Sequence, residues 1–198
     1  MIAILNTNGN IGSVVNAFQK LGQPCVVTRD LQILQKADRI VLPGQGAAGP
    51  VMALLRRYGL DTFLRETKKP VLGICLGLQL MAERSEEGDT ECLGLIPGTV
   101  RRFRTSLPVP HVGWNKIFDF RFQNSQIKNL KSKIKNQNDF FYFTHSYYLP
   151  VGDCTLATAV YDTPFSAIIQ KENFLGVQFH PEKSGDVGQK ILQNFCHL

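Results

Sequence analysis

The sequence predicts a three-layer α/β fold, in which a mostly parallel central sheet lies between flanking helices and gains an antiparallel or mixed extension in the C-terminal half. In the first 90 residues, short apolar runs alternate with segments of helical spacing, as is typical of parallel sheets. After about residue 92, strand-like runs follow one another with only turn residues between them. The 198 residues contain no linker rich in Pro, Gly or Ser, so we expect a single domain over residues 1–198.

The first half of the chain alternates strands and helices. Residues 2–5 are an apolar run that stops at a turn-forming cluster, and apolar residues at helical spacing then continue to Gly22. The predicted elements are, in order, a strand at 2–5, a helix at 11–22, a strand at 24–28, a helix at 31–37, a strand at 39–44, a helix at 51–66, a strand at 70–74 and a helix from residue 76.

The second half contains short runs of aromatic and β-branched residues bounded by turns. We expect these runs to form antiparallel or mixed strands that extend the sheet, followed by one closing helix. The strands are predicted at 98–103, 141–149, 155–161, 165–170 and 174–179, and the helix at 185–198.

Composition excludes several classes of protein. Apolar residues make up 43% and charged residues 19% of the chain, which is typical of a globular protein. The net charge of +6 is mostly scattered, with short basic clusters at 101–104 and 128–137, so we expect no nucleic-acid partner. Five cysteines without a CxxC pair indicate neither a disulfide framework nor a metal site. No apolar segment suits a signal peptide or a membrane span, so we expect a cytoplasmic protein with no membrane partner.

The stretch PVLGICLGLQLM, residues 70–81, places a cysteine between two glycines where a predicted strand meets a predicted helix. Active sites of open α/β sheets lie beyond the carboxyl ends of the parallel strands. Gly73 and Gly77 allow close approach and a tight turn, which predicts an elbow that exposes the Cys75 sulfur at a helix N-terminus. The N–H of Leu76 is a candidate oxyanion donor. A lone cysteine is more commonly a small buried hydrophobe, but the flanking glycines favour a nucleophile.

A nucleophilic cysteine needs a base, and the chain has four histidines, at 111, 145, 180 and 197. His180 is the best placed, because the predicted strand at 174–179 delivers it at its end. We expect Pro181 to continue the chain in extended form, which puts Glu182 on the same side as His180, where the carboxylate orients the imidazole. The sequence therefore predicts a triad of Cys75, His180 and Glu182, in which His180 takes the thiol proton and later protonates the leaving amine.

A second glycine turn, LPGQGAAG at residues 42–49, follows the predicted strand at 39–44. Such a turn can direct a backbone N–H toward the site and complete an oxyanion hole. The alternatives are a phosphate-binding loop or an ordinary turn. The turn lacks the lysine of a P-loop, which makes nucleotide binding the weaker interpretation.

These motifs resemble those of the class I, or triad, glutamine amidotransferases: PVLGICLGLQLM contains Cys75, and GVQFHPEKS contains His180 and Glu182. Within that class, LPGQG, SEEGD, LGLIPGTVRRF, VPHVGWN, FYFTHSYY and VQFHPEKSGDVG are similar to motifs of the glutaminase subunits of imidazole glycerol phosphate synthase, from histidine biosynthesis. The resemblance runs from the first predicted strand to the C-terminus. It implies the flavodoxin-like fold of class I glutaminases.

The resemblance implies hydrolysis of L-glutamine to glutamate and ammonia, with no metal or organic cofactor. Cys75 would attack the side-chain amide and form a glutamyl thioester that water cleaves, with His180 as general base and acid and Glu182 as its orienting partner. Position 45 is glutamine where the family often carries valine, so we expect the ease of the peptide flip at this turn to differ. Further residues match the family's substrate-binding and oxyanion positions: Gln79 and the backbone of His145, Ser146 and Tyr147 for the substrate, and Gly44, Gln45 and Gly46 for the peptide that flips.

The resemblance also implies a partner. In the family, a (βα)8-barrel cyclase docks over the glutaminase site to form a heterodimer and receives ammonia through a protein channel. The cyclase makes imidazole glycerol phosphate and aminoimidazole carboxamide ribonucleotide. Asn10, Trp114 and Lys183 match positions at that interface, although a core tryptophan and a surface lysine are ordinary alternatives for the last two. The stretch NTNGN lacks the aspartate or tyrosine often seen just after the first strand.

Other functions stay open at this point. A paralogue with the same triad could supply ammonia to another acceptor, as in the amidination of a surface sugar. An independent hydrolase would be active without any partner. A non-enzymatic interaction subunit is disfavoured by the intact triad, and a nucleic-acid binder would rest on net charge alone and show salt-sensitive binding.

Overall fold

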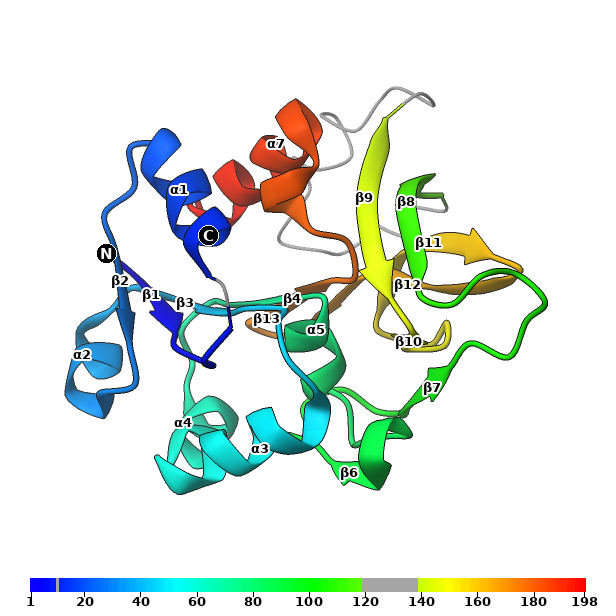
Figure 1. Ribbon diagram of the computed structural model, residues 1–198. Helices are drawn as coiled ribbons and strands as arrows, with labels where there is room; N and C mark the ends of the chain where they lie inside the picture. The colour runs from blue at the N-terminus through cyan, green and yellow to red at the C-terminus, as the bar shows by residue number, and fades with distance from the viewer. Residues whose placement is uncertain (10, 119–138) are drawn as a thin grey trace.

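The computed structural model describes residues 1–9, 11–118 and 139–198 and has the predicted three-layer α/β architecture (Figure 1). Five neighbouring strands of its main sheet are parallel, and two more continue it in antiparallel order at one edge. Within the described residues, the strands run across this sheet in the order β11 (Thr155–Tyr161), β12 (Thr163–Lys171), β13 (Phe174–Val177), β4 (Val71–Ile74), β3 (Arg39–Leu42), β1 (Ile2–Leu5) and β2 (Cys25–Thr28).

Helices cover both faces of the sheet (Figure 1). Ile2 and Ile4 of β1 point into one apolar core, and Ala3 and Leu5 point into the other. Both faces of the central strands are therefore buried, which explains why these strands appear in the sequence as continuous apolar runs. α1 (Gly12–Lys20) and α7 (Gly185–Phe195) contribute to the first core, and α2 (Leu31–Lys36), α3 (Ala48–Arg57), α4 (Leu60–Glu66) and α5 (Leu76–Leu80) contribute to the second.

The helix predicted at 51–66 is two helices, α3 and α4. Gly59 lies between them with a φ of +66°, a left-handed conformation that glycine adopts easily and that interrupts the helical path. Helical spacing of apolar residues continues across this glycine, so the break is not visible in the periodicity. The helix also begins earlier than predicted, at Ala48.

Two of the later strand-like runs do not extend the main sheet, which corrects the prediction for 98–103 and 141–149. The second run divides at Ser146, and its two parts join different sheets. Alternation along a strand specifies its faces but not its neighbour. β8 (His111–Lys116) and β9 (Phe140–His145) form an antiparallel ribbon, while a small sheet contains β10 (Tyr147–Tyr148), β7 (Thr99–Arg102), β5 (Arg84–Ser85) and β6 (Thr90–Glu91).

The carboxyl ends of the parallel strands position the candidate site. Because these strands share one direction, the segments that follow β1, β3, β4 and β13 meet at one edge of the sheet. They are residues 6–9, 43–46, 75 and 178–180. The predicted interface residue Asn10 and the basic cluster 128–137 lie outside the described residues. Within the described ranges, no helix has the length and apolar character needed to cross a bilayer.

Candidate active site

Cys75 sits on a strained elbow between β4 and α5. Its φ of +50° and ψ of −105° are rare for a residue with a side chain. A Cβ at Gly73 would lie 2.7 Å from the carbonyl of Gly77, and a Cβ at Gly77 would overlap the carbonyl oxygen of Leu42. Both glycines therefore allow backbones to touch, as the spacing predicts. The elbow places Cys75 directly before the first residue of α5.

His180 and Glu182 are in contact, but by a different path from the predicted one. Nδ1 of His180 donates to Oε1 of Glu182 over 2.8 Å, and both side chains are buried. Instead of extending the chain, Pro181 begins a single 3-10 turn, η2 (Pro181–Lys183). Proline suits the first position of a helical turn because its φ is already fixed near the helical value. The turn folds the Glu182 carboxylate back onto the imidazole.

The charge state of His180 depends on its two neighbours. Burial of the imidazole acts to lower its pKa. The charge of Cys75 and a hydrogen bond to it, then the hydrogen bond and charge of Glu182, outweigh burial and raise the pKa of His180 from 6.5 to about 10. The structure thus brings all three predicted triad residues together, with His180 in contact with both Cys75 and Glu182.

The loop after β3 lies against the elbow. A Cβ at Gly44 would overlap the carbonyl oxygen of Ile74 and lie 2.7 Å from Cβ of Cys75. Gln45 lies against Gly9 of the loop after β1, where an added Cβ would lie 2.5 Å from Cβ of Gln45. The structure therefore places the predicted oxyanion residues at 44–46 beside the elbow, with Leu76 next in the chain.

The predicted substrate-binding residues are brought together, but several of their polar groups are already paired. Nε2 of Gln79 donates to the carbonyl of Tyr147 over 2.7 Å, and Nδ1 of His145 donates to the same carbonyl over 2.8 Å. The carbonyl of Ser146 accepts the N–H of Phe103 over 3.0 Å.

Two of the predicted interface residues lie on the surface beside His180. Trp114 is 57% exposed, which excludes the alternative of a core tryptophan. Its ring packs edge-on against Tyr142 at 5.9 Å between centroids, and Nζ of Lys183 lies 5.7 Å from the centroid of Tyr142. The carbonyl of Tyr142 accepts the N–H of His180 over 2.9 Å. This cluster of Trp114, Tyr142 and Lys183 therefore adjoins the triad.

Sequence reasoning missed Gln178, the fully buried residue that follows β13. Its Nε2 donates to Sγ of Cys75 over 3.5 Å, and its Oε1 accepts from Nε2 of Gln79 over 3.1 Å. The one available signal was a polar residue within the apolar run FLGVQF, directly before the His-Pro-Glu motif.

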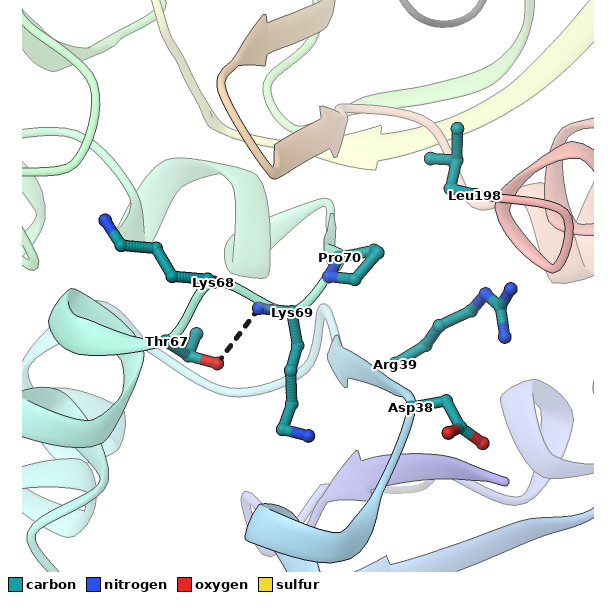
Figure 2. A pocket seen from close by; sticks show the side chains of 7 residues that line it. All are labelled: Asp38, Arg39, Thr67, Lys68, Lys69, Pro70 and Leu198. Atoms are coloured by element: carbon teal, nitrogen blue, oxygen red, sulfur yellow. Dashed lines mark hydrogen bonds between the residues drawn. The ribbon is translucent and has the colours of Figure 1, made fainter.

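A large hollow of about 680 Å³ lies elsewhere, at the opposite edge of the sheet (Figure 2). It is next to the amino ends of β3 and β4 and contains none of the candidate site residues. Its lining residues are Asp38, Arg39, Thr67, Lys68, Lys69, Pro70 and Leu198. Over the described part of the chain, no group of three or more His, Cys, Asp or Glu side chains is arranged to hold a metal ion.

Comparison with known proteins shows which family this chain belongs to. Residues 4–198 match the family described as glutamine amidotransferase class-I. Proteins named imidazole glycerol phosphate synthase subunit HisH are 45% identical in Bacteroides fragilis and 44% identical in Xanthomonas oryzae pv. oryzae. These matches cover 100% of this chain and 99% and 97% of the two relatives. Legionella pneumophila has a 44% identical protein named subunit HisH 2, matched over 100% of this chain and 98% of its own length.

Solved structures share the fold at low sequence identity. A crystal structure described as a glutamine amidotransferase has a TM-score of 0.74 and 17% identity over 99% of this chain and 97% of its own. A glutamine amidotransferase from Thermotoga maritima has a TM-score of 0.61 and 15% identity over 91% of this chain and 75% of its own. Family match, full-length relatives and fold agree: the chain belongs to the class I glutamine amidotransferases and, within them, to the HisH subunits of imidazole glycerol phosphate synthase.

Proposed function

We propose that this chain hydrolyses L-glutamine with a triad of Cys75, His180 and Glu182 and passes the ammonia to a (βα)8-barrel cyclase. The observation that carries the proposal is the strained elbow that holds Cys75 next to the buried His180–Glu182 pair. The raised pKa of His180 favours its imidazolium form, an acid that can protonate the leaving nitrogen.

The reaction then proceeds in two halves. The Cys75 sulfur attacks the side-chain carbonyl carbon of glutamine, and the C–N bond breaks as His180 gives its proton to the leaving nitrogen, which departs as ammonia. Water attacks the thioester while His180 takes a proton from it, and the proton returns to sulfur as glutamate leaves. Glu182 holds the imidazole in one orientation through both halves.

Backbone groups stabilise the charge that develops on the substrate oxygen. Donors aimed at such an oxyanion contribute on the order of 10²- to 10³-fold to the rate. The N–H of Leu76 is one donor, and a peptide in the loop Gly44–Gly46 supplies the second when it turns toward the site. Gln45 packs on Gly9, so the loop after β1 is placed to influence that turn. Gln79 and the backbone of residues 145–147 line the glutamine pocket.

The exposed face of the β8–β9 ribbon is the proposed docking surface for the cyclase. Val112, Trp114 and Phe140 are each at least 43% exposed on this ribbon, and Lys183 adjoins it through Tyr142. Large apolar side chains exposed together on one face are typical of a protein–protein interface. The matched relatives carry the name of a synthase subunit, which supports a second subunit here.

Glutamate release from L-glutamine tests the proposal. The purified chain would be assayed alone and then with a histidine-pathway cyclase and its nucleotide substrate or product. We expect little release from the chain alone and strong release in the complex, with Cys75→Ala abolishing release while the complex still forms. Full activity of the chain alone would indicate an independent hydrolase. Absence of glutamate release in every condition would favour an amidotransferase for another acceptor.

A further inference from the structure

Behind the Cys75 sulfur lies a buried amide that the proposed reaction does not use. Gln178 is 0% exposed, and its Nε2 donates to Sγ of Cys75 over 3.5 Å. On another side, Sγ lies 3.8 Å from the carbonyl oxygen of Thr144, which can accept from a thiol but repels a thiolate. The Gln178 amide therefore supplies a donor that suits the charged form of the sulfur.

One backbone carbonyl dictates which end of that amide faces sulfur. The carbonyl of Tyr147 can only accept, so Gln79 must turn its NH₂ group toward it, as the 2.7 Å contact requires. The second hydrogen of the same NH₂ group then meets Oε1 of Gln178 over 3.1 Å. Gln178 is left with its own NH₂ group toward Cys75. A flipped amide at Gln79 would set its oxygen against two acceptors, and a flipped amide at Gln178 would set two NH₂ groups against each other.

The same carbonyl also anchors two buried histidines. Nδ1 of His145 donates to the carbonyl of Tyr147, so Nε2 of His145 accepts from Nδ1 of His111 over 3.1 Å. Nε2 of His111 in turn accepts from Nδ2 of Asn115 over 3.4 Å. Burial lowers the pKa of His145 to about 3 and that of His111 to about 4, so both rings are neutral near pH 7 and keep these roles.

From these contacts we propose that Gln178 is a positioning residue for Cys75, held in its orientation by a hydrogen-bonded chain through Gln79, Tyr147, His145 and His111. The proposal rests on the proposed function, because it concerns the sulfur as a nucleophile. The chain begins at Asn115 on β8, the strand that carries Trp114 of the docking surface. It links that ribbon to the nucleophile through side chains of the protein interior.

The test is the rate at which iodoacetamide alkylates Cys75, followed at the level of the Cys75 peptide by mass spectrometry. Gln178→Met keeps a similar length and removes the donor, and Gln178→Glu keeps the shape and replaces the donor with an acceptor. We expect both variants to alkylate about tenfold more slowly than the wild type at pH 7.5, since one hydrogen bond to a charged atom is lost. In the cyclase complex, kcat for glutamate release should fall about tenfold with KM within about twofold of the wild type.

A matched control separates positioning from a general loss of packing. Gln170→Met makes the same change on β12, where Gln170 lines a hollow at the far edge of the sheet, and should leave Cys75 alkylation unchanged. His111→Phe keeps an aromatic ring at this position and removes the donor to His145. It should slow alkylation of Cys75 about threefold, less than the substitutions of Gln178.

The outcomes decide between the alternatives. Alkylation of folded Gln178→Met and Gln178→Glu at the wild-type rate would overturn the positioning role, and should Gln178→Met fail to fold, Gln178→Glu decides alone. If His111→Phe is alkylated at Cys75 at the wild-type rate, the residues of the hydrogen-bonded chain beyond Gln79 do not influence Cys75. Failure of the wild type to release glutamate in the complex would reject the proposed function, while the alkylation rates would still decide the role of Gln178.

Discussion

The side chain of Glu182 is 1% exposed, and its two carboxylate oxygens differ in their hydrogen-bond partners. Oε1 accepts from His180, whereas Oε2 is buried without a hydrogen-bond partner among the described residues. A buried carboxylate oxygen without a donor destabilises the fold. Glu182 therefore orients the His180 ring through a single hydrogen bond, which Nδ1 of His180 donates to Oε1. At the scale of single residues, the imidazole of His180 and the amide of Gln178 both contact the Cys75 sulfur, and Glu182 orients the imidazole.

Glu182→Gln is therefore expected to impair catalysis without large structural change. The amide has the same shape but no charge, so it weakens the hold on Nδ1–H and removes part of what raises the pKa of His180. We expect kcat for glutamate release to fall by about 10²- to 10⁴-fold, as when the corresponding carboxylate of a triad is neutralised. A kcat within threefold of the wild type would contradict the role of Glu182.

The buried histidines make stability depend on pH. In the unfolded chain both rings take up protons below about pH 6.5, whereas in the folded protein His111 does so only near 4 and His145 near 3. The unfolded state binds more protons between these values. Stability is therefore fully present above about pH 6.5 and is lost as the pH falls toward 4.

Removing one of these rings should reduce that dependence. For His111→Phe, we expect the free energy of unfolding to fall less steeply between about pH 6 and 4.5, by up to about 1.4 kcal/mol per pH unit. Urea denaturation of wild type and variant across this range measures the two slopes. Equal slopes would mean that His111 takes up its proton in the folded protein as readily as in the unfolded chain.

At the scale of elements, the elbow depends on contacts between backbones. The α5 helix lies so close to β3 that Gly77 touches the carbonyl of Leu42, and Gly73 touches the first turn of α5. These contacts hold β4 and α5 close enough for the tight turn at Cys75. A side chain at either glycine would separate the helix from the sheet.

Gly77→Ala is expected to destabilise the protein strongly. Its Cβ would overlap the Leu42 carbonyl, a backbone atom in a central strand that cannot move easily. We expect a loss of about 3 kcal/mol or more in the free energy of unfolding, measured by urea denaturation. Gly152→Ala is the control, because an added Cβ there meets nothing within 4 Å, and its effect should stay within about 0.5 kcal/mol.

The parallel strands, the elbow and the proximity of His180 and Glu182 could be predicted from the sequence because each rests on a local pattern. Apolar runs mark β1, β3 and β4, and the glycines around Cys75 mark the elbow. The η2 turn could not be predicted, since Pro181 is compatible with both an extended chain and a helical first turn. Nor could the role of Gln178, because its partners Cys75 and Gln79 are 103 and 99 residues away in the sequence.

At the scale of the whole molecule, the ribbon that β8 and β9 form is a sheet of its own (Figure 1), and the carbonyl of Tyr142 on β9 accepts the N–H of His180. Its outer face carries exposed aromatic side chains, and its inner face carries His111, Phe141 and Phe143 into the interior. One element thus carries both the proposed docking surface and the first residues of the hydrogen-bonded chain proposed to end at Cys75. The pairing of β8 with β9, instead of with the main sheet, depends on contacts between distant segments, so it could not be predicted from the residues of either strand alone.

Trp114→Ala should weaken the complex with the cyclase and leave the fold intact. Large exposed aromatics at the centre of an interface commonly contribute about 2 kcal/mol, so we expect Kd to rise about 30-fold in calorimetric titration. Leu198→Ala, an exposed apolar residue at the opposite edge of the sheet, should leave Kd unchanged. Equal affinities for wild type and Trp114→Ala would place the docking surface elsewhere.

The strained backbone at Cys75 affects which substitutions at this position are favourable in related chains. Glycine adopts a φ of +50° with a ψ of −105° readily, whereas any other residue holds it at a strain of about 1–3 kcal/mol. In a lineage that no longer needs the thiol, random substitution toward glycine would relieve that strain and would tend to be retained. We therefore expect glycine to be the favoured replacement at this position in related chains that lack glutaminase activity.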